Sequence, residues 1–360
     1  MEIRSLGEDA YFAASNSASG FFSYYGDCFD DRRIKRLYAI KGGPGTGKSR
    51  FLREVAEYGK ERDWEVEYIY CSSDPDSLDG VILSRERRCI ALLDATAPHV
   101  YEPSRPGVRE EIINLGAFWD GEKLAARAEE LEAWSLEKRS AYRRAYRYLA
   151  GAGEMEAIRN EQIAPLVNTD RLRRYAGKLM RDVEQGQGYS VRPALIHSVG
   201  MRGRVGLDTY FAKAGRIFLI EDCHGAAQFL MNALLENCAD RRLAVRVSHD
   251  PVIPERLDGL FLRDARIAFV VLPSKECAYP HRVLSVRRFL NAAQLRRVRG
   301  QILYAERMKR ALMDGAIEEL ERVREVHFRM EQVYADAMDF SRKEAFTRIF
   351  CQRLFDLQKD

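Results

Sequence analysis

Cysteine is scarce in this sequence of 360 residues, and long apolar runs are missing. The seven cysteines are odd in number and form no C-x-x-C pair, which argues against both a disulfide framework and a zinc site built from thiolates. No apolar run approaches the roughly 18 residues that a membrane-spanning helix requires. The N-terminal residues 1–10 lack the apolar core of a signal peptide. We therefore expect a cytoplasmic protein with reduced cysteines and no membrane partner.

An excess of charge of one sign is also missing. The 58 basic residues nearly balance the 54 acidic ones, which leaves a formal net charge of +4. Because arginine and glutamate alternate throughout instead of clustering, nucleic acid is not indicated as a main partner. A hydrophobic content of 46% with 31% charged residues is typical of a globular protein. The length predicts about two domains.

The most specific motif lies at residues 41–49, which read Lys-Gly-Gly-Pro-Gly-Thr-Gly-Lys-Ser. This segment matches the phosphate-binding pattern G-x-x-x-x-G-K-[S/T] at every fixed position. An apolar run at residues 37–40 precedes it, and a helical pattern that begins at Phe51 follows it. The sequence thus predicts the strand, glycine-rich loop and helix that this motif requires.

Each residue type in the loop has a chemical role. The glycines allow successive backbone N–H groups to turn toward phosphate oxygens, and the following helix adds the positive end of its dipole. Lys48 is expected to reach the β- and γ-phosphates, and the Ser49 hydroxyl to bind Mg²⁺. The expected ligand is ATP, with GTP as the less favoured alternative. The predicted nucleotide-binding residues are Gly42, Gly43, Pro44, Gly45, Thr46, Gly47, Lys48 and Ser49.

A second buried strand, at residues 89–93, ends at Asp94. A carboxylate at this place usually supplies the second protein contact to Mg²⁺, so Ser49 and Asp94 are the predicted metal ligands. Lys48 and Asp94 are the predicted catalytic residues. Ala95 follows Asp94 where many P-loop hydrolases place a water-activating glutamate, so the sequence leaves that group unidentified.

Other polar residues have a functional and a structural interpretation. His99 either senses the γ-phosphate or is a hydrogen-bonded structural histidine. Asp74, Asp76 and Asp79 either face the ligand or make turns and caps. An arginine finger and a solvated helix face are the alternatives for Arg85, Arg87, Arg88, Arg143, Arg144 and Arg147.

The second half of the chain repeats the pattern of the first. Residues 216–221 align with residues 36–41 at an offset of 180, and Phe289 matches Phe118 at an offset of 171. We therefore predict an α/β fold in which a P-loop-type parallel sheet, covered by helices and carrying an α-helical appendage, occurs twice and packs as an internal pseudo-dimer. The predicted modules are 1–186, with a helical insert at about 121–185, and 190–360, with a helical tail at about 292–360.

The second copy has lost the phosphate-binding residues. In this alignment Gln228 replaces Lys48, Phe229 replaces Ser49, and the acidic pair at 221–222 precedes a single remaining glycine. Negative side chains would repel phosphate. We therefore expect one nucleotide site per chain.

These motifs give the chain a resemblance to a family of uncharacterised bacterial proteins with two tandem P-loop ATPase-like modules. The resemblance rests on residues 41–49, 71–80 and 94–100, extends to residues 111–116 and 144–149, and covers nearly the whole chain in outline. It implies ATP binding and ATP hydrolysis, usually in both modules, and it supplies no substrate. The degenerate second module departs from the family pattern.

Three functions stay open at this point. The first is Mg²⁺-dependent ATP hydrolysis coupled to an unknown task. The second is a kinase for a small molecule or nucleotide, which the absence of a glutamate after Asp94 permits. The third is an ATP-dependent regulator with little turnover. The nucleoside triphosphate is the expected partner, and the phosphate acceptor or protein partner is unknown.

Overall fold

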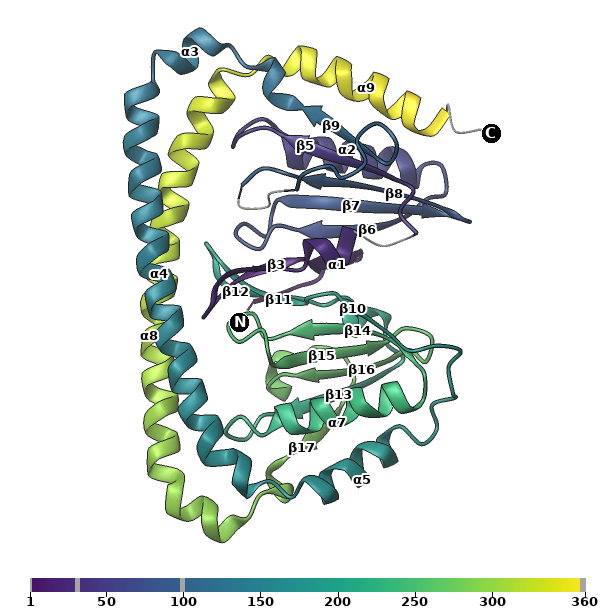
Figure 1. The fold of residues 1–360 in the computed structure, drawn as a ribbon, viewed down its shortest axis with the longest axis vertical. Helices are drawn as coiled ribbons and strands as arrows, with labels where there is room; N and C mark the ends of the chain where they lie inside the picture. The colour runs from purple at the N-terminus through teal and green to yellow at the C-terminus, as the bar shows by residue number, and fades with distance from the viewer. Residues whose placement is uncertain (1, 30–32, 98–100, 357–360) are drawn as a thin grey trace.

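The computed structural model describes residues 2–29, 33–97 and 101–356. Two six-stranded sheets follow one another along the longest axis of the molecule, and two long helices run side by side past both sheets (Figure 1). In the described part of the chain, nine α-helices and these mixed sheets make an α/β fold.

The first sheet has the strand order β2-β6-β7-β8-β5-β9. Strand β5 lies between β8 and β9 and is parallel to both. The strands are β2 (Asp9–Phe12), β5 (Arg36–Lys41), β6 (Glu65–Tyr70), β7 (Leu78–Arg85), β8 (Arg88–Asp94) and β9 (Glu110–Asn114).

The second sheet has the order β10-β14-β15-β16-β13-β17. When the strands of each sheet are numbered by their order in the chain, the two sheets have the same order and the same strand directions. The strands are β10 (Ser190–Pro193), β13 (Arg216–Glu221), β14 (Ala244–His249), β15 (Leu257–Leu262), β16 (Ile267–Val271) and β17 (Arg282–Ser285).

The prediction of parallel sheets is wrong, because three neighbouring strands of each sheet form an antiparallel meander. In the first sheet, β7 joins β8 through Glu86 and Arg87 alone. A two-residue loop connects only antiparallel strands, since a parallel pair needs a crossover of a dozen or more residues. The apolar runs of the sequence indicate strands that are buried on both faces of the sheet. Burial on both faces does not determine strand direction.

Smaller elements lie between the two sheets and at their edges. Strand β1 pairs in parallel with β12, so the beginning of the described chain joins the second half. The short strands are β1 (Glu2–Arg4), β3 (Ala14–Ser17), β4 (Gly20–Ser23), β11 (His197–Gly200) and β12 (Gly203–Leu207), and the short α-helices are α1 (Tyr25–Phe29), α3 (Gly121–Ala125) and α6 (Thr209–Lys213).

Helix α2 (Lys48–Lys60) follows β5, and α7 (Ala227–Asp240) follows β13. The hydrophobic residues of α2 pack into the first core, and those of α7 pack into the second. Three short 3₁₀ helices lead into or out of the long helices, namely η1 (Leu115–Phe118), η2 (Ala164–Leu166) and η4 (Arg287–Phe289), and η3 (Ser274–Glu276) lies between β16 and β17.

The long helices exchange their ends between the two modules. Helix α4 (Ala128–Ile163) leads from the first sheet to α5 (Thr169–Leu179), which packs on α7 in the second core. Helix α8 (Ala292–Asp336) runs back alongside α4 and leads to α9 (Phe340–Asp356), which packs on α2 (Figure 1). Each module is therefore completed by a helix that follows the long helix of the other module.

The helix caps show that this exchange is reciprocal. Asp120 caps α3 and Asn291 caps α8, each by accepting two backbone N–H bonds, and they lie 171 positions apart. Asn168 accepts from the Arg171 amide at the start of α5, as Asp339, 171 positions later, accepts from the Arg342 amide. The same spacing relates the bridges Trp119–Met338 and Val167–Leu290.

Among the described residues, no helix combines the length and the apolarity that crossing a bilayer requires.

Candidate functional site

The glycine-rich loop joins β5 to α2 at the carboxyl edge of the first sheet. Gly45 and Gly47 both have φ near +72°, a conformation that side chains with a Cβ rarely adopt. A Cβ on Gly45 would also lie 2.5 Å from the carbonyl oxygen of Glu331 on α8. The loop thus requires glycine for its own conformation and for its packing against the long helix.

Lys48, the first residue of α2, turns back across the loop. Its Nζ donates to the carbonyl oxygens of Gly42 at 2.7 Å and Gly43 at 2.8 Å, and lies 3.5 Å from Asp94 Oδ2. Both the lysine and the aspartate side chains are 13% exposed. The structure therefore brings together the two residues that the sequence predicted to be catalytic.

Asp94 ends β8 beside Ile40, the neighbouring position on β5. Burial raises the pKa of the Asp94 carboxyl, the Lys48 charge opposes this, and the Asp79 carboxylate adds to it. Asp94 Oδ1 also accepts from the Thr96 amide at 2.9 Å, which fixes the orientation of the carboxylate.

Ser49 is held by the start of β7, because its Oγ accepts from the Leu78 amide at 2.9 Å. Ser49, Asp79 and Asp94 line one cavity, and hydroxyl and carboxylate oxygens are the ligands that Mg²⁺ prefers. No cluster of three His, Cys, Asp or Glu side chains suited to a metal occurs within the described residues. These residues fit Mg²⁺ as an ion that receives most of its ligands from phosphate oxygens and water.

The cavity over the loop has a volume of about 220 Å³, is partly open, and has the long helices along one side. Lys138 and Tyr142 of α4 line it, together with His327 and Glu331 of α8. The volume is below the roughly 300–1,000 Å³ of typical small-molecule sites. A space of this size suits phosphate groups, and a nucleoside would extend beyond it.

Sequence reasoning missed these residues on the long helices. The Nζ of Lys138 lies 3.3 Å from Nδ1 of His327. Burial lowers the pKa of Lys138, and the positive charge of Lys48 lowers it further. Burial also lowers the pKa of His327, to about 4, and the charges of Lys138 and Lys48 contribute to this. Burial raises the pKa of Glu331, and the Asp74 charge adds to this. The sequence feature that could have identified these residues is the offset of 171, which also relates Lys138 to Lys309.

The loop of the second module contains its own negative group. Asp222 Oδ2 accepts from the Gly225 amide and Oδ1 from the Ala227 amide, each at 2.9 Å. The carboxylate therefore uses backbone donors at the start of α7, the place where a helix N-terminus binds anions. Gln228 donates to the side chain of Asn160 on α4.

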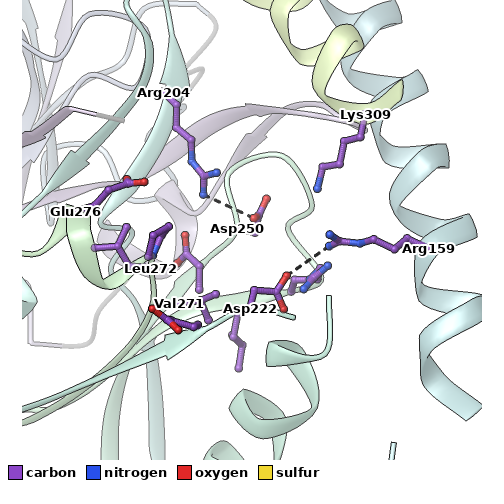
Figure 2. A pocket seen from close by; sticks show the side chains of 13 residues that line it. Arg159, Arg204, Asp222, Asp250, Val271, Leu272, Glu276 and Lys309 are labelled. Atoms are coloured by element: carbon purple, nitrogen blue, oxygen red, sulfur yellow. Dashed lines mark ion pairs between the residues drawn. The ribbon is translucent and has the colours of Figure 1, made fainter. Parts of the chain in front are cut away.

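The second module also lacks a carboxylate at the position of Asp94. Val271 of β16 pairs with Ile220 of β13, as Asp94 of β8 pairs with Ile40 of β5. Figure 2 shows Val271 at the wall of the corresponding cavity, close to Asp222.

The cavity of the second module has a volume of about 600 Å³, and its basic residues have acidic partners. Glu156 is 3% exposed and pairs with Arg159 at 2.6 Å, with Lys309 at 2.7 Å and with Arg256. Arg159 also points to Asp222, and Arg204 points to Asp250 (Figure 2).

Of the remaining sequence candidates, Asp74 and Asp79 line the cavity over the loop, while Asp76 and the arginines do not. His99 lies outside the described residues. Asp74 accepts from Ser77 Oγ at 2.8 Å, and Asp76 pairs with Arg4, so both serve the turn between β6 and β7. The six arginines are exposed on the β7–β8 turn, which is the end of β8 away from Asp94, and on α4: Arg85, Arg87, Arg88, Arg143, Arg144 and Arg147.

The chain matches no known protein-family model, no curated protein and no solved structure at a significant level. The family resemblance therefore stays a prediction, and the function has to be inferred from the geometry of the site.

Proposed function

We propose that the first module is a P-loop nucleotide-binding module that takes up ATP with Mg²⁺ and hydrolyses it. The observation that carries this proposal is the loop between β5 and α2, where Lys48 and Asp94 lie 3.5 Å apart at the carboxyl ends of adjacent strands. A loop of backbone donors, a lysine, a hydroxyl and a carboxylate is the set of groups that phosphoryl transfer requires.

The chemistry consists mainly of charge neutralisation. The loop amides and Lys48 would bind the β- and γ-phosphates, and Ser49 and Asp94 are the protein groups that would hold Mg²⁺. Mg²⁺ supplies charge stabilisation at the phosphate oxygens when it is bound. We assign the orientation of the attacking water to Glu331, which lines the cavity from α8 and whose pKa is raised by burial.

A nucleotide-dependent regulator with little turnover is the second candidate. The observation that favours it is the packing of α8 directly on the loop at Gly45, together with the small cavity beneath. Phosphate binding at this place would act on helices that contact both modules. The kinase alternative is favoured by Ala95, which stands where a hydrolase would place its glutamate.

Titration of the purified protein with Mg–ATP and Mg–GTP tests the proposal, and one bound nucleotide per chain is the expected result. Lys48→Ala should lower the affinity at least about 100-fold, because it removes a charge-assisted contact. Gln228→Ala, at the equivalent place in the second module, should leave the affinity unchanged. Two sites per chain, or equal losses in both variants, would contradict the proposal.

Turnover separates the three functions. Release of phosphate without an added acceptor supports hydrolysis, and Glu331→Gln should then slow the release while nucleotide binding persists. Transfer that occurs only with a small-molecule or nucleotide acceptor supports the kinase. Tight binding with negligible turnover supports the regulator.

A further inference from the structure

A lysine occupies the same position on both long helices. Lys138 on α4 and Lys309 on α8 lie 171 positions apart, which is the spacing of the caps Asp120 and Asn291. Lys138 lines the cavity of the first module and Lys309 that of the second. The lysine on the long helix therefore belongs to both copies of the site.

The partners of the two lysines differ. Lys309 forms an ion pair with Glu156 at 2.7 Å. The residue that corresponds to Glu156, 171 positions later, is His327, which lies 3.3 Å from Lys138. Within the described residues, Lys138 forms no ion pair with a carboxylate. Among the residues that the structure describes, no acidic side chain therefore pairs with the positive charge of Lys138.

The second copy carries two carboxylates that the first copy lacks. Asp222 accepts from the loop amides, and Glu156 accepts from Lys309. Gly42 stands in the place of Asp222 in the alignment at offset 180, and His327 stands in the place of Glu156 in the alignment at offset 171. A ligand with two negative groups, one on the loop and one at the long helix, would provide both missing charges.

We infer that Lys138 contacts the terminal phosphate of the nucleotide bound by the first loop, so that the helix pair α4–α8 distinguishes a triphosphate from a diphosphate. This inference rests on the proposed function. Lys48 approaches the phosphates from the loop, and Lys138 approaches from α4 on the same cavity. The β-phosphate meets the loop amides, and the γ-phosphate lies between two ammonium groups. His327 keeps the Lys138 ammonium oriented toward the cavity.

Lys138→Met tests this role, since it keeps the length of the side chain and removes the charge. We expect the affinity for Mg–ATP to fall about 10- to 100-fold, as for the loss of a charge-assisted hydrogen bond. The affinity for Mg–ADP should change by less than about twofold, because ADP has no terminal phosphate at this place. Lys138→Arg should retain part of the preference for ATP.

Lys309→Met is the matched control, because it removes the equivalent lysine of the second copy and should leave both nucleotide affinities unchanged. The unfolding temperature of nucleotide-free Lys138→Met should equal or exceed that of the wild type, since a half-buried charge without an acidic partner is removed. A lower unfolding temperature would show that Lys138 supports the fold, and would overturn the inference.

The outcomes separate this inference from the proposed function. A wild-type protein that binds neither nucleotide overturns the proposed function. A wild-type protein that binds ATP, with a Lys138→Met variant whose ratio of ATP to ADP affinity is unchanged, overturns only the contact with the terminal phosphate.

Discussion

Single residues show how the two loops came to differ. The acidic pair at 221–222 suggested repulsion of phosphate, but the structure gives another reason, because the Asp222 carboxylate itself accepts from the amides of Gly225 and Ala227. Glu221 is occupied elsewhere, since it accepts from Ser274 Oγ at 2.9 Å. A side chain that occupies the donors at the start of a helix competes with any external anion.

Gly45→Ala is the residue-scale prediction. The substitution places a side chain at a positive φ and against the backbone of α8, where a Cβ would meet Glu331 and Ala335. We expect a loss of about 2–4 kcal/mol in the free energy of unfolding, measured by denaturant titration. Gly300→Ala is the control on an open stretch of α8, where the new Cβ meets nothing within 4 Å; it should gain about 0.5–1 kcal/mol from helix propensity. Equal effects would show that the loop does not depend on this contact.

Among the secondary-structure elements, helices α9 and α5, which follow the two long helices, complete the two cores. Helix α9 places aromatic rings on the first core, where Phe350 lies 5.3 Å from Phe51 and 5.1 Å from Tyr38 between ring centroids. Helix α5 packs into the second core in the same way, and its Leu172 is 2% exposed. The core of each module is thus completed by an amphipathic helix that arrives from the other module.

Phe350→Ala is the prediction at the element scale. Loss of the ring should cost about 2–4 kcal/mol of unfolding free energy, and it should loosen α2, on which α9 packs. Amide hydrogen exchange measures this, with faster exchange expected at 48–60 and unchanged exchange in α7. Ile349→Ala, on the same helix but 57% exposed, should stay within about 0.5 kcal/mol of the wild type. Faster exchange in both modules would contradict the assignment of α9 to the first core.

The molecule as a whole consists of two modules that cannot be separated by cutting the chain between them. Helices α4 and α8 pack along their length, and each leads to a helix that packs in the core of the other module (Figure 1). The same helix pair lines both cavities, through Lys138 and His327 in the first and Arg159 and Lys309 in the second. A ligand in one cavity would therefore contact helices that also line the other cavity.

A cut between Gln187 and Gly188, in an exposed stretch between the modules, provides the prediction at this scale. Coexpressed fragments 1–187 and 188–360 should form a stable one-to-one complex, because the exchanged helices hold them together. Native mass spectrometry and size-exclusion chromatography measure the assembly. Each fragment alone should aggregate or self-associate, because its core lacks the helix that the other fragment carries. Two separate folded monomers would refute the exchange.

The sequence by itself determined the local features of the site. Strand β5, the glycine-rich loop and the start of α2 follow from neighbouring residues, as does the position of Asp94 at the end of β8, because propensity, periodicity and glycine conformation act over a few residues. The offset of 180 between the two loops showed which one had lost its lysine.

Only the tertiary structure decided strand direction, the exchange of α5 and α9, and the placement of Lys138, His327 and Glu331 at the cavity over the loop. Hydrophobic periodicity records that a face is buried, but it does not record which surface buries it. Lys138 follows Lys48 by 90 positions and His327 follows it by 279. Packing of the two long helices brings both residues to the cavity.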